Sequence, residues 1–389
     1  MKRTQSKRRV DNDSRIRRAT VHSIAQIGID RISMADIARR ADLTTGALYG
    51  RFETLDDLVL DCWQNELSRT LFESLDALRQ ILLSDSPPIS KESWPEISVN
   101  TTAALQLLVA SRRNPILSEG LERELLEWGK KWDLHRESEP TARMRSSIAT
   151  SLVLAKLLTP YLAMDQDIWL RMSQVIASAL AVSRSEVMEY PDAGMVVTAT
   201  GPDQLHCDLV NSTMDVIARS GFEGSSLSRI ARRALCTTGA IYSRYESKSE
   251  LVVDAIEILV ASAARVSSRL VIEGASSHDL STSVARMFHM ALAHERQVWN
   301  NFRLEVYLAA SWESSIRRCL RRVKQTSDER YFSLLQPTNL FSDDLISQIA
   351  IAGQFIPLGL SALSVITDGH KDVQYLEVSK NLMKLCGAS

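Results

Sequence analysis

The chain has 389 residues and a formal net charge of −1, and 45% of its residues are hydrophobic and 24% charged. This length excludes a single ordinary core and indicates two or more domains, and the composition is that of a soluble globular protein. Apolar residues recur mainly with the 3.6-residue period of helices, and alternating apolar runs are rare, so we expect an all-α fold.

The five cysteines form no C-x-x-C pair, which argues against a disulfide framework or a zinc site and favours a reducing cytoplasm. The basic N-terminus is followed by no apolar run, so we do not interpret it as a signal peptide. The stretch 345–367 carries no charge and is long enough to span a bilayer, but it contains Gln348, Gln354 and Pro357. We expect a helix buried at a packing interface there, and no membrane partner.

The first 13 residues are basic and polar and show no apolar periodicity. We expect a flexible arm here, either a solubilising tail or a segment that lies along phosphates or in the minor groove. Residues 1–52 as a whole hold twelve Lys and Arg against five Asp and Glu. A basic end on a chain of almost zero net charge fits local contact with phosphates.

Three helices are predicted after this arm. The first runs from about residue 13 to 27 and ends at Gly28. Ser33 then caps a short helix whose apolar residues recur at i, i+3, i+4 and i+7, and Thr44 caps another short helix after a tight turn. Two short helices joined by a tight turn form a helix-turn-helix, and its second helix fits the major groove of DNA.

The same arrangement recurs at a constant offset of 193 residues, so that Gly28 matches Gly221 and Tyr49 matches Tyr242. From 28 to 61, about half of the positions are identical and no gap is needed. The chain therefore carries a tandem duplication. The second copy is less basic, because residues 203–245 hold five Lys and Arg against four Asp and Glu.

At these residues the chain resembles the TetR (tetracycline-repressor-like) family of bacterial transcriptional regulators. The resemblance rests on the glycine after helix 1, the Ser cap, the Ile-Ala pair, the Thr-Gly-Ala-Leu/Ile-Tyr run, the aromatic residue after it and an acidic-Leu helix 4, at 28–58 and again at 221–251. It implies two TetR-like halves. Each would have an N-terminal three-helix DNA-binding domain followed by a helical domain for ligand binding and dimerisation.

The residues that we expect at the DNA are the caps, glycines, tyrosines and basic residues of the two helix-turn-helix copies: Ser33, Thr44, Thr45, Gly46, Tyr49, Arg51, Ser226, Thr237, Thr238, Gly239, Tyr242, Arg244 and Lys248. A threonine hydroxyl at a helix N-terminus can meet a phosphate or a base, and a glycine lets the backbone come close. The alternative for each residue is a local role, as a cap, a packing glycine or a half-buried tyrosine.

Two positions depart from the family pattern. The turn glycine is replaced by Asp42 and Leu235, although a left-handed backbone costs non-glycine residues about 1 kcal/mol or more. The lysine that opens helix 4 in the family is Lys248 in the second copy but Leu55 in the first. We therefore expect the two heads to read different half-sites.

The larger part of each half carries no motif, and it includes a stretch at 299–324 that we expect to form one helix. No catalytic constellation, phosphate loop or histidine pair for a metal stands out, so we predict no enzyme activity and no cofactor. The family resemblance implies a small-molecule effector. Candidate pocket residues, for which ordinary helical core is the alternative, are Trp128, Trp132, Trp169, Met287, Met290, Trp299 and Trp312.

In the resembling family two protomers pair through their last two long helices. The matching pairs here are 147–164 with 170–182, and 343–366 with 373–385, and we expect Pro160 and Pro357 to bend the first helix of each pair. Burying these helices against each other would form an intramolecular pseudo-dimer. It would place the recognition helices about 34 Å apart, the spacing of successive major grooves.

We therefore divide the chain into a basic flexible arm (1–13), a first helix-turn-helix domain (14–60), a first helical regulatory domain (61–183), a linker (184–203), a second helix-turn-helix domain (204–253) and a second regulatory domain (254–389). The predicted function is a cytoplasmic, ligand-responsive repressor that reads an imperfect palindrome in double-stranded operator DNA. The alternative is one active head, with a degenerate second copy used for protein–protein association. Pairing of two chains into a homodimer of pseudo-dimers stays open.

Overall fold

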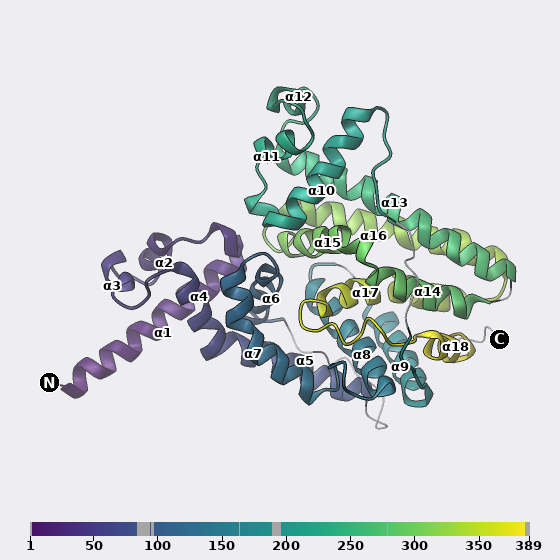
Figure 1. The fold of residues 1–389 in the computed structure, drawn as a ribbon, viewed down its shortest axis with the longest axis horizontal. Coiled ribbons are helices and arrows are strands. Elements are labelled where there is room, and N and C mark those ends of the chain that lie inside the picture. The colour runs from purple at the N-terminus through teal and green to yellow at the C-terminus, as the bar shows by residue number, and fades with distance from the viewer. Residues whose placement is uncertain are drawn as a thin grey trace.

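The computed structural model describes residues 2–83, 94, 97–162, 164–188, 196–277 and 279–385, and these residues are all-α (Figure 1). They contain no strand, although one isolated antiparallel bridge pairs Val187 with Val373. The all-α class that the helical periodicity predicts is confirmed. The middle of the predicted linker, 189–195, lies outside the described residues.

The first half contains a three-helix head and a helical body. Its described helices are α1 (Lys2–Ile27), α2 (Met34–Arg40), α3 (Thr45–Tyr49), α4 (Leu55–Cys62), α5 (Ser68–Leu83), α6 (Val99–Ser111), α7 (Pro115–Lys131), α8 (Pro140–Leu158) and α9 (Gln166–Val182). A π-helical segment, Trp63–Leu67, joins α4 to α5, and a short 3-10 helix, Ile29–Arg31, follows α1.

The second half repeats this order. Its described helices are α10 (Gln204–Gly224), α11 (Leu227–Arg233), α12 (Thr238–Tyr242), α13 (Lys248–Ser277), α14 (Leu280–Leu292), α15 (Gln297–Ala309), α16 (Ser314–Leu335), α17 (Asp343–Leu363) and α18 (Leu376–Leu385). Short 3-10 helices, His294–Arg296 and Gln336–Thr338, precede α15 and follow α16. In Figure 1 the two heads lie at separate corners of the molecule, with α3 and α12 at their outer ends.

Two expected helix boundaries are wrong. The segment 2–13, predicted as an arm, belongs to α1, because Lys, Arg and Gln are good helix formers and the segment has no Pro or Gly to stop the helix. The stretch 299–324 is divided between α15 and α16. The Arg317 guanidinium donates to the carbonyls of Ala310 and Ser311 in the intervening turn, which satisfies backbone groups that a helix end leaves unpaired.

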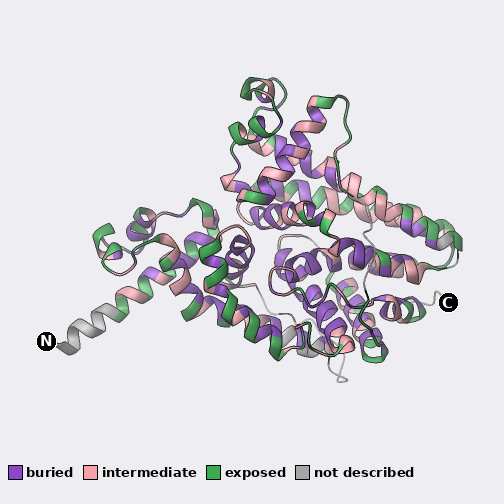
Figure 2. Cartoon of the chain, in the orientation of Figure 1, coloured by how far each residue is buried: buried purple, intermediate pink, exposed green. Residues whose placement is uncertain are grey.

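The last two helices of each half form a four-helix bundle, in which α8 packs on α17 and α9 packs on both α17 and α18. Gly359 of α17 lies so close to Ser151 of α8 that a Cβ on Gly359 would be 1.8 Å from the Ser151 carbonyl oxygen. The buried Arg143 of α8 pairs with Asp372 of the other half at 2.9 Å. Most residues of both crossing helices are buried, 14 of the 19 in α8 and 12 of the 21 in α17 (Figure 2). The fold is therefore an intramolecular pseudo-dimer, as predicted.

The two bundle prolines differ in position. Pro357 lies inside α17, but Pro160 follows α8, which ends at Leu158, because the residue before a proline disfavours the helical conformation. Pro160 therefore does not bend α8. Among the described helices, α17 is the one that is long and apolar enough to cross a membrane by length and composition. Of its apolar 18-residue stretch, 61% is buried inside the protein.

A second contact between the halves lies at the base of the heads. Gly28, after α1, lies against the indole of Trp312, and the matching Gly221 of α10 lies against the guanidinium of Arg113. Both glycines have positive φ, 88° and 75°, and a Cβ on them would lie 2.9 and 2.7 Å from these side chains. Trp312 stands two residues before α16, and Arg113 stands two residues before α7. Each half therefore contacts the glycine of the other half from the equivalent position.

Candidate nucleic-acid interface and internal cavity

In the first head, side-chain caps fix both helices of the helix-turn-helix. The Ser33 hydroxyl accepts a hydrogen bond from the Asp36 backbone N–H, which starts α2, and the Thr44 hydroxyl accepts one from Ala47, which starts α3. Leu48 is fully buried in the head, so the opposite side of α3 faces outward. Thr45 and Gly46 are exposed at the start of α3.

The second head is built in the same way. Ser226 accepts from the Arg229 backbone N–H at the start of α11, and Thr237 accepts from Ala240 at the start of α12. Ile241 is fully buried, and Thr238 and Gly239 are exposed. The two outward-facing tyrosines are similarly placed, with Tyr49 55% exposed and Tyr242 61% exposed.

Asp42 and Leu235 adopt the left-handed conformation that the turn requires, with φ of 54° and 55°. Asp42 accepts a hydrogen bond from the Arg15 guanidinium at 3.0 Å. Leu235 is 94% exposed and places an apolar side chain on the outer surface of the second head. The two heads therefore present different chemistry at the same turn.

Neither steric contact nor backbone conformation requires glycine at Gly46 of α3 or at Gly239 of α12. A Cβ on Gly46 would meet nothing within 4 Å, and a Cβ on Gly239 would make one ordinary contact, at 3.6 Å from the Thr237 hydroxyl oxygen. Neither glycine has positive φ. Because glycine in a helix costs up to about 1 kcal/mol relative to alanine, the packing alternative fails, and an open outer surface remains for a closely approaching partner.

The two arginines predicted at phosphates are engaged inside the heads. Arg51 donates to the Asp13 carboxylate at 2.7 Å and to the Ala47 carbonyl, and Arg244 donates to Asp203 at 2.9 Å. These arginines tie the recognition helix to helix 1 of its own head.

Lys248 opens α13, and its ammonium donates to the Phe222 carbonyl at 2.8 Å and lies 4.1 Å from the centre of the Phe222 ring. Partial burial lowers the pKa of Lys248. The lysine therefore joins α13 to the end of α10, rather than extending freely toward solvent.

A basic groove between α1 and α2 was not predicted. It is lined by Arg15, Arg18, Ala19, His22, Gln26, Arg40 and Ala41, and no acidic residue lines it. Among the described residues, Arg18 forms no ion pair, so its charge is available to an anion. The signal was present in the sequence, because Arg15, Arg18 and His22 recur at helical spacing on one face of α1.

The second head lacks the net positive charge of this face, because two of its positions become aspartates while Gln26 and Arg40 correspond to Arg219 and Arg233. At the offset of 193, Arg15, Arg18 and His22 correspond to Asp208, Asn211 and Asp215 of α10. The Asp215 carboxylate forms ion pairs with the guanidiniums of Arg219 and Arg233, at 2.9 and 2.7 Å. The basic groove therefore belongs to the first head alone within the described structure.

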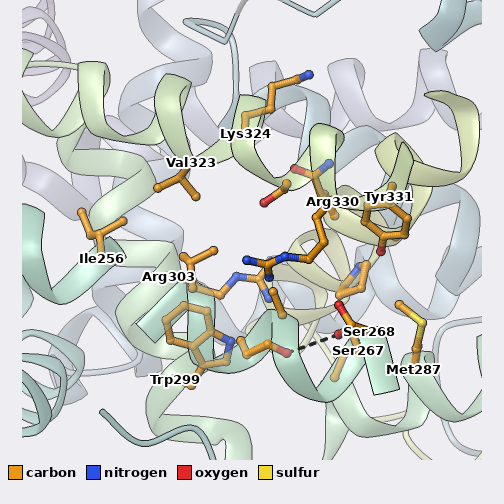
Figure 3. A pocket seen from close by; sticks show the side chains of 18 of the residues that line it. Ile256, Ser267, Ser268, Met287, Trp299, Arg303, Val323, Lys324, Arg330 and Tyr331 are labelled. Atoms are coloured by element: carbon orange, nitrogen blue, oxygen red, sulfur yellow. Dashed lines mark hydrogen bonds between the residues drawn. The ribbon is translucent and has the colours of Figure 1, made fainter. Parts of the chain in front are cut away.

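An internal cavity lies in the body of the second half, among α13, α14, α15, α16 and α17 (Figure 3). It holds about 1090 Å³ of space not filled by protein atoms, part of which is open to solvent. Its walls are mainly apolar and include Ile256, Val260, Met287, Trp299 and Val323. Three arginines also line it: Arg296, Arg303 and Arg330.

The corresponding part of the first half is filled by large side chains. Trp63 and Leu67 of the π-helical segment and Leu71 and Leu75 of α5 are all fully buried. At the same offset, α13 carries the smaller residues Ile256, Val260, Ala264 and Ser268. The difference in side-chain volume opens the interior of the second half beside α13.

Of the seven residues proposed for a pocket, Met287, Met290 and Trp299 line the cavity. The candidates predicted from the sequence were tryptophan and methionine residues only, so the arginines of the cavity were not predicted. An isolated arginine in a helix is usually read as solvent-exposed, so Arg303 and Arg330 gave no signal.

The other four pocket candidates are packed elsewhere. Trp128 and Trp132 donate from their indole N–H groups to the Asp76 carboxylate, at 2.7 and 2.5 Å. Trp169 packs across the bundle against α17, and Trp312 packs at the base of the heads. These residues fill protein interior and interface, where indole rings bury a large apolar area.

Comparison with known proteins gives three findings. A sequence model described as "Bacterial regulatory proteins, tetR family" matches residues 16–62 and again 209–255. Two proteins described as uncharacterized HTH-type transcriptional regulators, Rv2912c of Mycobacterium tuberculosis and Mb2936c of Mycobacterium bovis, are each 31% identical over 135 residues, which is 34% of this chain and 69% of theirs. The solved structure of the multidrug binding protein EbrR complexed with imidazole covers 46% of this chain and 97% of its own, with 20% identity and a TM-score of 0.33.

The two matched segments coincide with the two heads, from α1 to α4 and from α10 to the start of α13. The repeat found in the sequence is thus a repeat of one known domain. The chain belongs to the TetR family of bacterial regulatory proteins, and it carries the helix-turn-helix DNA-binding domain of that family twice in one polypeptide.

Proposed function

We propose that this protein is a cytoplasmic, ligand-responsive repressor that binds a double-stranded DNA operator with both heads of one chain. The observation that carries the proposal is the pair of exposed recognition helices with bare glycines, Gly46 and Gly239, at positions where no intramolecular contact requires glycine. The exposed Thr45 and Thr238 beside them supply hydroxyls for base or phosphate contacts.

The operator is an imperfect palindrome, because the two heads differ at their outer surfaces. Asp42 and Leu235 occupy the same turn, and the basic groove of the first head corresponds to a face with no net charge on the second. The pseudo-dimer supports one chain per operator, with each recognition helix in a separate major groove. A second chain, if present, would pair as a dimer of pseudo-dimers.

The effector is a small molecule that enters the cavity of the second half. Helix α13 connects this cavity to DNA, since it begins at Lys248 against the second head and passes the cavity at Ile256, Val260 and Val271. A ligand that separates α13 from α16 would therefore tilt the second head. A regulator of this kind needs a ligand with different affinity for the two arrangements.

A second candidate function has one active head, with the second copy used for protein–protein association. The loss of net positive charge on this face favours it, because Asp208 and Asp215 stand where Arg15 and His22 line the basic groove of the first head. In that case two chains would be needed to cover two half-sites.

The experiment that separates these functions starts with binding-site selection from random duplex DNA by the purified full-length chain. Light scattering of the complex then gives the number of chains on the selected site. One chain on a site with two unequal half-sites supports the pseudo-dimer proposal. Two chains on two identical half-sites would support the alternative, and the absence of any selected sequence would refute both.

A further inference from the structure

We propose that the second-half cavity binds an amphipathic organic anion, a carboxylate attached to an aliphatic chain, with one molecule per polypeptide. This inference rests on the proposed ligand-responsive function and adds the chemical class of the ligand. Two features support it, a positively charged centre without an acid and an apolar chamber beside it that shares four of its lining residues.

The charged centre consists of Arg303 of α15 and Arg330 of α16, whose side chains extend from different walls toward the middle of the cavity (Figure 3). Within the described residues, neither guanidinium forms an ion pair with a carboxylate. Arg303 lies over the Trp299 ring, 5.7 Å from its centroid, and burial lowers the pKa of Arg303. Cations in a mainly apolar space are costly until an anion neutralises them.

The other groups that face the cavity do not change this balance. No Asp or Glu lines it. Lys324 is already neutralised, because its ammonium lies 2.6 Å from the Asp328 carboxylate, and Asp328 itself is outside the lining. Arg296 adds a third cation, and the proximity of Arg303 contributes to lowering the pKa of Arg296 to about 10, after the larger effect of burial. The cavity therefore discriminates against cationic ligands.

The apolar continuation lies between the cavity and the four-helix bundle. It shares Val271, Met287, Tyr331 and Gly353 with the cavity and holds about 640 Å³ of space not filled by protein atoms, part of which is open to solvent. No charged residue lines it. A methionine thioether side chain is flexible, so Met287 is suited to yield to an aliphatic chain that passes from one space into the other.

This chamber is also lined by the first half, through Met172, Val175 and Ile176 of α9. A ligand whose carboxylate sits at Arg303 and Arg330 and whose tail enters the chamber would touch both halves at once. Ligand binding would thereby be coupled to the packing of the two halves, and tail length would determine the strength of the coupling.

The test is isothermal titration calorimetry of the full-length chain, without DNA, with three ten-carbon probes: decanoate, decanol and decyltrimethylammonium. The two ionic probes are kept below their critical micelle concentrations and decanol below its solubility limit. We expect decanoate to bind with a stoichiometry of one per chain, decanol at least tenfold more weakly and the cation not at all. No binding of decanoate at 1 mM, two molecules per chain, or equal affinity for decanol would overturn the proposal.

Variants locate the site. Arg303→Gln and Arg330→Gln should each weaken decanoate at least tenfold and leave the affinity for decanol unchanged, whereas Arg318→Gln, on the exposed side of α16, should change neither. Met287→Phe should weaken decanoate more than hexanoate, because the shorter chain does not need the chamber. An unchanged decanoate affinity in both cavity arginine variants, with circular dichroism showing folded protein, would contradict the assignment.

Failure of the ligand proposal can be distinguished from failure of the proposed DNA-binding function. A chain that selects operator DNA but binds no decanoate keeps its function as a DNA-binding regulator and loses only this ligand class. A chain that binds decanoate but selects no DNA would show the reverse.

Discussion

Glu305 of α15 accepts a hydrogen bond from the guanidinium of Arg112, at 3.0 Å, and this ion pair joins the second half to the first. Arg113 donates to the same carboxylate at 3.1 Å and also to Asp30 beside the first head. The Glu305 side chain is 6% exposed, and burial raises its pKa although both guanidiniums favour the charged form. The cluster therefore lies, well shielded from water, where both heads meet the body.

Replacing this carboxylate should uncouple the halves. Glu305→Ala leaves Arg112 and Arg113 buried with less compensating charge, which typically costs about 3–5 kcal/mol of unfolding free energy. The measurement is urea unfolding followed by circular dichroism. In the double variant Glu305→Ala/Arg112→Ala the loss should be smaller than the sum of the single losses. Additive losses would show that the pair contributes no coupling across the halves.

The helix crossing at Gly359 gives a second prediction. Gly359→Ala places a methyl group 1.8 Å from the Ser151 carbonyl oxygen, and two backbones must separate to accept it. We expect a loss of about 1–3 kcal/mol or more in unfolding free energy, the usual range for an overpacked core. Gly129→Ala in α7 is the matched control, because a Cβ there meets nothing within 4 Å, and it should be neutral or stabilising by up to about 1 kcal/mol. Equal effects of the two substitutions would contradict this account of the crossing.

The recognition-helix glycines should separate stability from DNA binding. Gly46→Ala and Gly239→Ala add a methyl group that meets open space or one ordinary contact, so each variant should be as stable as the parent or more stable by up to about 1 kcal/mol. If DNA approaches these positions closely, affinity for the selected operator should fall about tenfold, or about 1.4 kcal/mol. Fluorescence anisotropy with labelled duplex measures the affinity. A variant with full affinity would remove its head from the interface.

The unequal charge of the heads predicts opposite mutational effects. Arg18→Ala should weaken DNA binding and reduce the salt slope by about one unit, as expected for the loss of one phosphate contact. Asp208→Arg installs in the second head the residue type found at the matching position of the first, and it should strengthen binding and steepen the slope if that head lies on DNA. Titrations at several salt concentrations measure both. An unchanged slope for Asp208→Arg would support the one-headed alternative.

Acid should weaken the four-helix bundle. His370, between α17 and α18, is fully buried, with its Nε2 3.0 Å from the Ser364 hydroxyl, and its pKa falls to about 3, chiefly through burial and further through Lys371, against the opposing effect of Asp368. An unfolded histidine has a pKa of about 6.5, so between these values the unfolded chain binds the proton and the folded chain does not. Stability should therefore fall as pH drops below about 6.5, by up to about 1.4 kcal/mol per pH unit for this residue.

The check is urea unfolding at pH 7 and pH 5 for the parent and for His370→Asn. The variant should lose part of the pH dependence. It should retain the part due to His289, whose pKa burial also lowers to about 3. An identical pH dependence in parent and variant would show that His370 is protonated in the folded protein.

Much of the fold could be predicted because local signals agreed with tertiary packing. Helix α7 is found at Pro115–Lys131, as expected from its proline and its apolar spacing, and both helix-turn-helix copies follow from their caps and buried Leu48 or Ile241. The break between α15 and α16 had no such signal. It contains no Pro or Gly and depends on Arg317, whose bonds to the turn appear only in the folded structure.

The functional residues were harder to predict for the same reason. The position of Arg51 beside the recognition helix suggested a phosphate contact, but Asp13, 38 residues away, holds it inside the head. The cavity arginines looked like ordinary helical surface, because their burial depends on the smaller residues of α13. Sequence spacing identifies which side chains share a helix face, and it does not show which distant carboxylate or wall that face will meet.

The bundle of α8, α9, α17 and α18 forms within one polypeptide, so the two heads are present in a fixed one-to-one ratio at any concentration. If one chain fills the operator, as proposed, occupancy would rise with the first power of chain concentration, with no prior association step to make the response steep at low abundance. Each head can also accumulate substitutions that its twin does not share, so an asymmetric site can evolve without mixed assemblies.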